Sequence, residues 1–416
     1  MAGADPLVLS DRLKRDPGHD VTERDAACHA CNDKGRSYSP ESKRPTTLAS
    51  MSRTTLILLL ALAWFSFGHT TQQSDDEVSK IYLVGTTLYR ATGGKVIDIY
   101  DLSVPIAPQK VGGIAVTENS DIAVAGRYLY ADQGADLVVI DVGDPSRPVP
   151  VDTIKGIFNQ AYSYGWGRDD RSPGVIEGGG MQGCGPCAAS EAATAPAADS
   201  RSGGRGGSLS RFAIVDHRLY CVDYSTIRVF DISDPSRPRY KNGVSIGWGI
   251  ETVVADGLYL FIGGETGMSI YQRRGDDVAY VSEFRHRRSC DPVVVEGNRA
   301  YVTLRGGTTC GGFTNQLDII DISNISGPVL INSHPLNGPF GLAVRDGIVI
   351  VCDGSAGLKV LDVANPLNVR EIASITDIVP HDVILSGALL IVTTDGGYLL
   401  YDASDLRNLV RVGLVG

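Results

Sequence analysis

The sequence predicts an all-β protein built as a β-propeller of four-stranded blades, with seven blades expected and six as the alternative. Three observations lead to this prediction. A short apolar strand that ends on Asp recurs along the chain, the copies are spaced by about 40 residues, and each unit divides into four short strands. A unit of this length that holds several short strands is typical of a propeller blade.

The recurring strand occurs in seven copies, each followed by a turn. Their anchor residues are Asp101, Asp141, Asp231, Gln272, Asp321, Asp362 and Asp402. The steps between successive anchors are 40, 90, 41, 49, 41 and 40 residues, so the second step holds one unit and an insertion. Gln272 departs from the pattern and predicts a different turn in the fourth unit. Six blades would remain if the first unit were not a true blade.

The repeated aspartate has a local explanation in the turn that follows it. In turns such as DISDPSRP, Asp and Ser side chains can bond to backbone groups and Pro fixes φ. We therefore assign a structural role to the six anchors Asp101, Asp141, Asp231, Asp321, Asp362 and Asp402. The alternative, a set of catalytic carboxylates, fits poorly because equivalent acids around a ring do not make one active site.

Residues 290–334 show most clearly how a unit divides into four strands, here named A to D. They read CDPVVVEG, NRAYVTL, QLDIIDI and GPVLINSH, with Gly, Asp and Asn at the breaks, as strand–turn patterning requires. The last unit ends on its own strand D. We therefore expect the ring to close by plain pairing of its first and last blades, with an exchanged strand from before Ile81 as the alternative.

The N-terminal part predicts export. Met51-Ser52-Arg53 and the apolar run LILLLALAWFSF make residues 51–72 a secretory signal peptide, and the propeller is expected over 79–416. Residues 1–50 are charged and aperiodic, so we expect them to be untranslated or disordered. A membrane anchor is the alternative, but the run of 12 residues is short for a span of about 20. The expected location is secreted, periplasmic or at the cell surface.

The insertion covers about 156–207 and separates the second unit from the third. Gly, Ala and Ser dominate it, so we expect much of it to be flexible. The net charge of -10 argues against a nucleic-acid partner, which would require a clustered basic face. We expect no transmembrane span in the mature chain and a monomer.

The turn sequences resemble those of a known family. LVVIDVGDPSRP (137–148), IRVFDISDPSRP (227–238) and LDIIDISN (317–324) look like the LVIVD-repeat proteins, extracytoplasmic β-propellers of bacteria. The resemblance extends over roughly 80–416. It implies a propeller fold and secretion or surface display, and it brings no assigned activity and no catalytic residues.

A ligand site is expected at the mouth of the central channel, where the D–A loops, the B–C loops and the starts of strand A converge. The candidate ligand-binding residues there are Asp121, Glu251, Asp291, Arg305, His381 and Asp382. Carboxylates with one imidazole would suit a hard cation such as Ca²⁺, or hydrogen bonds to a sugar. The alternative is that these acids only cap strand starts, so no metal is assigned.

Two cysteine pairs predict disulfides. Cys290 and Cys310 lie in two loops that share one face of the fifth unit, and such a bridge suits an oxidising compartment. Cys184 and Cys187 are expected to form a local disulfide that pins the insertion. Their alternative, a reactive thioredoxin-type dithiol, lacks the βαβ setting that such a motif needs. Two other cysteines, at 221 and 352, fall within B strands and are expected to be buried, inert thiols.

No catalytic constellation stands out, because the chain has no G-x-S-x-G elbow, no H-E-x-x-H and no phosphate-binding loop. We therefore expect a secreted or surface-displayed scaffold that binds an extracellular protein or glycan without chemistry. The alternative from another class is a metal-dependent hydrolase or lyase with a carboxylate site at the channel mouth.

Overall fold

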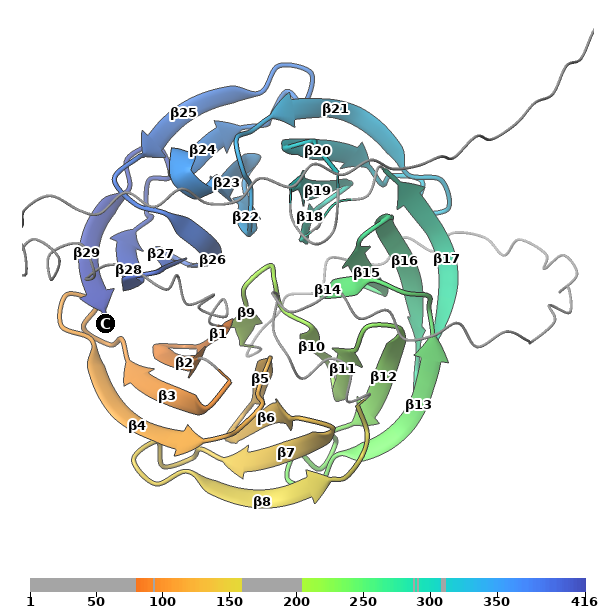
Figure 1. Ribbon diagram of the computed structural model, residues 1–416, viewed down its shortest axis with the longest axis vertical. Coiled ribbons are helices and arrows are strands. Elements are labelled where there is room, and N and C mark those ends of the chain that lie inside the picture. Colours follow the sequence, from red (N-terminus) through yellow and green to blue (C-terminus); the bar gives the residue numbers. More distant parts are fainter. Residues whose placement is uncertain (1–79, 93, 159–203, 287–288, 290–291, 308–311) are drawn as a thin grey trace, which may run out of the picture. The chain divides into compact units, whose positions relative to one another are not determined.

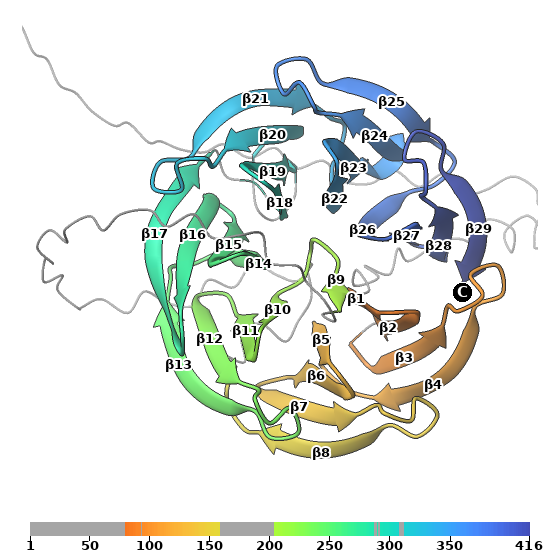
Figure 2. The same cartoon turned by 180° about the vertical axis from the view of Figure 1, so that it is seen from behind.

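Seven four-stranded antiparallel sheets stand in a ring as the blades of a β-propeller (Figures 1 and 2). The computed structural model describes residues 80–92, 94–158, 204–286, 289, 292–307 and 312–416. The prediction of seven blades is confirmed, and the first unit is a true blade. Among the described residues, no helix has the length and apolar character needed to cross a bilayer. The expected signal peptide lies outside these residues.

Each blade takes its four strands from one consecutive stretch of the chain. Blade 1 is β1 (Lys80–Val84), β2 (Thr87–Thr92), β3 (Val96–Asp101) and β4 (Gln109–Ala115). Blade 2 is β5 (Ile122–Ala125), β6 (Tyr128–Gln133), β7 (Asp136–Asp141) and β8 (Val149–Ile154). Blade 3 is β10 (Phe212–Val215), β11 (Arg218–Val222), β12 (Thr226–Asp231) and β13 (Arg239–Ser245). Blade 4 is β14 (Ile250–Asp256), β15 (Tyr259–Gly264), β16 (Gly267–Arg274) and β17 (Asp277–Arg285).

The remaining blades follow the same order. Blade 5 is β18 (Val293–Glu296), β19 (Arg299–Leu304), β20 (Gln316–Asp321) and β21 (Val329–Pro335). Blade 6 is β22 (Leu342–Arg345), β23 (Ile348–Cys352), β24 (Leu358–Asp362) and β25 (Arg370–Ile375), with a short 3₁₀ turn η2 (Gly354–Ala356) before β24. Blade 7 is β26 (Pro380–Ser386), β27 (Leu389–Thr394), β28 (Gly397–Asp402) and β29 (Val410–Val415).

Tight hairpins join strands A and B of the blades. In blades 1 and 2 the turn begins with Gly85 and Gly126, both at a φ of +58°. Asp216 and Asp346 take the equivalent place in blades 3 and 6, at +56° and +53°. Hairpin turns of this kind need positive φ, which Gly, Asn and Asp tolerate best. The turn chemistry therefore explains why these residues recur at the same point of each unit.

Hydrogen bonds of the anchor carboxylates shape the turns between strands C and D. Oδ1 of Asp231 accepts the backbone N–H of Ser233 at 2.9 Å and its hydroxyl at 2.6 Å. The Asp234 carboxylate accepts the N–H of Ser236 in the same manner. The other five anchor aspartates likewise accept the N–H two residues ahead. The polar anchors thus stabilise the loop that reverses the chain into strand D.

Blade 4 has a different C–D connection, as the departure at Gln272 predicts. Its strands β16 and β17 continue two residues further than in other blades, and Arg274 pairs with Asp277. Only Gly275, at a φ of +64°, and Asp276 remain between the strands. A short glycine turn therefore replaces the longer aspartate-anchored loop.

The hydrophobic core lies between the faces of successive blades. Alternating β-branched and aromatic side chains of neighbouring blades form these layers, as expected for sheets packed face to face. At the seam between blades 7 and 1, Leu83 and Tyr100 are buried together with Ile391, Leu400 and Val415. The Tyr100 hydroxyl also donates a hydrogen bond to the carbonyl oxygen of Gly416 at 3.3 Å. Among the described strands, none is exchanged across this seam.

Candidate binding site

The ring axis holds a segment of the chain that follows the insertion. The two-residue strand β9 (Arg205–Gly206) adds to the inner edge of blade 1, where Gly206 pairs with Tyr82 and Arg205 with Leu83. Figures 1 and 2 both show β9 inside the ring, next to β1. Residues 204–207 were expected to belong to the flexible insertion, whereas here they have a defined place at the centre of the propeller.

Asp382, a candidate ligand residue of blade 7, binds this segment. Its carboxylate accepts hydrogen bonds from the hydroxyl of Ser208 at 2.9 Å and from the N–H of Ser208 at 3.2 Å. The N–H of Leu209 donates to it at 3.4 Å. The N–H of Leu342 in blade 6 donates to the Ser208 hydroxyl oxygen at 2.9 Å. Asp382 is 3% exposed, so its carboxylate binds the chain's own backbone and is not open to solvent at the channel mouth.

Asp121, the corresponding candidate of blade 2, makes equivalent contacts just downstream. Its Oδ2 accepts the backbone N–H of Arg211 and, at 3.1 Å, that of Phe212. Its Oδ1 accepts the N–H of Ile122 at 2.8 Å. Burial raises the pKa of Asp121 to about 6, against the opposing effects of Lys80 and of these hydrogen bonds. Burial also raises the pKa of Asp382.

Lys80 belongs to blade 1, which stands in the ring between the blades that carry the two carboxylates. Its ammonium group donates to the carbonyl oxygen of Leu209, and its positive charge lowers the pKa of both Asp121 and Asp382. Blades 7, 1 and 2 therefore each contribute one charged side chain around the same segment. Such buried charges are tolerated because hydrogen bonds and opposite charge compensate for lost hydration.

The glycines of this segment have a steric reason. A Cβ atom on Gly207 would lie 1.9 Å from Oδ2 of Asp382, and one on Gly204 would lie 2.2 Å from the ring of Tyr82. A Cβ atom on Gly206 would lie 2.2 Å from the hydroxyl of Ser210. Only glycine lets the backbone approach its neighbours this closely. The Gly-Arg-Gly-Gly sequence of residues 204–207 therefore fits a narrow axial space.

Two other predicted residues meet on the face formed by the D–A and B–C loops. The guanidinium of Arg305 in blade 5 stacks over the ring of Phe340, 3.5 Å from the ring centroid. The edge of the His381 ring packs against Phe340 at 5.1 Å between centroids, and His381 pairs with Asp395. We name Arg305, Phe340, His381 and Asp395 the aromatic–cation cluster. It joins blades 5, 6 and 7 and is accessible to solvent.

The remaining predicted site residues are not brought together with these. Glu251 is half-buried within β14 in blade 4, and Asp291 lies outside the described residues. Within the described part of the chain, no three His, Cys, Asp or Glu side chains are placed to hold a metal ion. The candidate residues therefore divide into a buried axial pair, Asp121 and Asp382, and the half-buried cluster around Phe340.

The predicted disulfides at Cys290–Cys310 and Cys184–Cys187 lie outside the described residues. Cys221 in β11 and Cys352 in β23 are described, and both are free thiols without exposed surface. This confirms the expectation that these two cysteines are buried in B strands.

Three buried aspartates at the ends of strand B were not predicted. Asp353 accepts the N–H groups of Asn337 and Gly338, both at 2.8 Å. Asp132 accepts the N–H groups of Ser120 and Asp121, also at 2.8 Å. Asp223 is equivalent by position, since all three lie at the end of strand B in their units (ADQ, VDY and CDG). Asp132 and Asp353 hold D–A loops in place, whereas Asp223 accepts hydrogen bonds from Ser225 and Arg228. The repetition of this aspartate in three units was the available signal.

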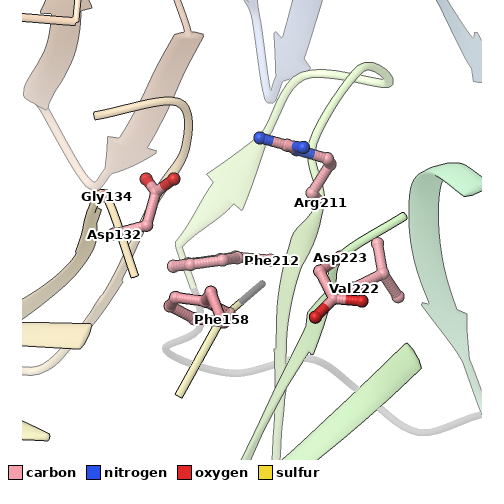
Figure 3. Close-up of a pocket in the computed structure, with 7 residues that line it drawn as sticks. All are labelled: Asp132, Gly134, Phe158, Arg211, Phe212, Val222 and Asp223. Atoms are coloured by element: carbon pink, nitrogen blue, oxygen red, sulfur yellow. The ribbon is translucent and has the colours of Figure 1, made fainter. Parts of the chain in front are cut away.

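A small cavity lies between blades 2 and 3. Asp132, Arg211 and Asp223 line it with Gly134, Phe158, Phe212 and Val222 (Figure 3). Phe158, near the start of the insertion, stacks on Phe212, after it, at 5.9 Å between ring centroids. The volume of about 20 Å³ suffices for a water molecule but is too small for a sugar or peptide side chain. The cavity is therefore not a candidate ligand pocket.

Comparison with known proteins identifies the repeats. The model of the LVIVD repeat matches residues 117–155 and 287–334, which fall in blades 2 and 5. This chain contains LVIVD repeats. The sequence resemblance and the seven-bladed fold agree, so the protein is consistent with the LVIVD-repeat β-propellers. None of the curated proteins that were compared matches this LVIVD-repeat propeller.

Solved structures resemble this propeller in fold. The periplasmic gluconolactonase PpgL of Pseudomonas aeruginosa is 12% identical, with a TM-score of 0.55 over 80% of this chain and 94% of that one. A protein from Lactobacillus plantarum is 12% identical, with a TM-score of 0.54 over 81% and 95%. A functionally unknown protein from Desulfotomaculum acetoxidans DSM 771 is 12% identical, with a TM-score of 0.52 over 80% of this chain and 95% of that one. At this identity the likeness extends to the fold alone.

Proposed function

We propose that this protein is a secreted or cell-surface scaffold that binds an extracellular protein or glycan through the face of its D–A and B–C loops. The aromatic–cation cluster is the observation that carries this proposal. It connects three successive blades on one face, and a stacked guanidinium with neighbouring aromatic edges suits recognition of polar ligands and flat sugar rings. The sequence of residues 51–72 supports export.

Trp248 adds a second exposed aromatic group to the same face. Its side chain is 79% exposed and packs edge-on against Tyr224, with 5.6 Å between ring centroids. Phe313, in the B–C loop of blade 5, is fully exposed. Large exposed aromatic side chains on rigid loops are frequent anchors of binding surfaces. They supply contact area that the small cavity between blades 2 and 3 does not.

The alternative of a metal-dependent hydrolase or lyase requires available carboxylates at the channel mouth. Asp121 and Asp382 would be the central acids of such a site, but both accept hydrogen bonds from the chain's own backbone. Binding without chemistry is therefore the better supported of the two functions.

Binding to defined ligands tests the proposal. The chain from Met51 onward, produced in an oxidising compartment and labelled, is applied to an array of defined glycans and crosslinked to surface proteins of the producing cell. A ligand found in either way should bind at least about tenfold more weakly to Trp248→Ala or Arg305→Gln. Arg147→Gln, on an exposed C–D turn of the opposite face, is the matched control. Equal binding by all three variants would contradict the proposal.

A further inference from the structure

We infer that the ring axis is a peptide-binding site whose occupant is the chain's own glycine-rich segment, Gly204–Arg211, and that the bound segment clasps the ring shut. The inference concerns the axis alone and does not depend on the proposed external ligand. It rests on where the segment lies, which blades it contacts and why it is rich in glycine.

The seam between blades 7 and 1 is the place where such a clasp matters. Every blade is made from consecutive strands, so no described strand is shared between the last blade and the first. The covalent chain that links all other neighbouring blades is absent at this seam. Its contacts include side-chain packing, the bond from Tyr100 to Gly416 and the guanidinium of Arg90 over the ring of Tyr398.

The axial segment forms a backbone connection between blades 7 and 1, which no covalent link joins at the rim. Arg205 and Gly206 pair with blade 1, and Ser208 bonds to Asp382 of blade 7. The Arg205 guanidinium also donates to the carbonyl oxygen of Leu385, in blade 7, at 3.4 Å. The segment therefore contacts both sides of the open seam at once.

The axial segment also forms hydrogen bonds with blades that do not border the seam. Leu342 of blade 6 donates to Ser208, and the carboxylate of Asp121 in blade 2 accepts from the N–H of Arg211. The N–H of Val253 in blade 4 donates to the carbonyl oxygen of Ser210 at 2.9 Å. The ligand class is thus a short strand followed by a turn, with consecutive N–H donors and with glycine where the backbone lies against Asp382 and Tyr82.

Hydrogen exchange of the full chain tests the clasp. Gly207→Ala places a methyl group against Asp382 and should expel the segment. We expect the amides of β1 and β26 to exchange roughly tenfold faster or more, while β18 and β19, which do not bond to the segment, keep their wild-type rates. Gly338→Ala is the matched control, because a Cβ atom there meets nothing within 4 Å; it should exchange like the wild type.

A milder variant covers the case in which Gly207→Ala does not fold. Ser208→Ala removes the hydroxyl that links Leu342 to Asp382, and it should raise exchange in β22 and β26 more than in blades 3 to 5. An increase spread evenly over all seven blades, or no increase at β1 and β26 in either folded variant, would overturn the inference.

Discussion

Gly413 in the last blade lies directly against Pro105 in the first, so closely that a Cβ atom on Gly413 would come 2.1 Å from the Pro105 carbonyl oxygen. The same contact occurs at the next seam, where a Cβ atom on Gly112 would lie 1.7 Å from the carbonyl oxygen of Pro145. In both cases the C–D turn of one blade packs on strand D of the preceding blade. The repeated turn therefore connects blades as well as strands.

Substitution of Gly112 tests this contact between blades. Gly112→Ala forces a methyl group against the Pro145 carbonyl and should lower the free energy of unfolding by about 1–3 kcal/mol. Urea denaturation followed by circular dichroism measures the change. Gly338→Ala, with open space around the added carbon, should unfold within about 0.5 kcal/mol of the wild type. Similar losses in both variants would argue against a steric origin.

A double-mutant cycle tests the axial contact between Gly207 and Asp382. Gly207→Ala should cost less free energy of unfolding in the Asp382→Ala background than in the wild type, because the clash with the carboxylate is gone. We expect an interaction energy on the order of 1–3 kcal/mol from denaturation curves of the four proteins. Strict additivity would mean that the two residues do not meet.

The raised pKa of Asp121 predicts a pH dependence of stability. Between 3.8 and about 6 the folded protein binds a proton on Asp121 that the unfolded chain has released. The contribution of this group to the free energy of unfolding therefore falls as the pH rises through that range, by about 2 to 3 kcal/mol. Urea denaturation at several pH values should give a shallower decrease for Asp121→Asn than for the wild type. Identical slopes would refute the assignment to Asp121.

The contribution of Asp231 to stability should depend on pH in the opposite sense. Hydrogen bonds from the Ser233 hydroxyl, then from its N–H, lower the pKa of Asp231 to about 2. The stability that this carboxylate contributes is present above 3.8 and is lost as the pH falls through about 2. Carboxyl ¹³C NMR titration should show the low pKa directly and a shift toward 3.8 in Ser233→Ala. An unchanged titration in that variant would show that another group holds the pKa down.

The thiols of Cys221 and Cys352 should be inert in the folded protein. Neither has exposed surface, and burial raises the pKa of both. A thiol reagent followed by peptide mass spectrometry should label them only after denaturation. Labelling of either peptide in the native protein would show that its blade opens locally.

The blades could be predicted because their signals are local. The period of the anchors, the alternation of apolar residues and the chemistry of the hairpins all act within one unit, so each unit reports its own fold. The different turn of blade 4 could also be predicted, because Gln272 replaces the anchor aspartate there. The repeated aspartates after strand B carried the same kind of signal, although they were not recognised.

The axial site could not be predicted because its partners lie far apart in the sequence. Asp121 and Asp382 were expected to converge on the channel, but the occupant that buries them comes from a glycine-rich stretch that composition assigns to flexible chain. Glycine serves both purposes, since it loosens an unpacked loop and also permits close packing. Gly204 and Gly207 serve close packing, and this is visible only from the positions of Tyr82 and Asp382 beside them in the fold.

The bond between Ser208 and Asp382 also orders the events of folding. The two residues are 174 positions apart, so the carboxylate that completes the axis belongs to the last blade to be synthesised. Contacts of such large sequence separation form slowly, because a long loop must close before they are gained. A chain that stops before blade 7 would have six formed blades and an axial segment in which Ser208 lacks its carboxylate acceptor. The axial contact is therefore completed only after blade 7 has been made.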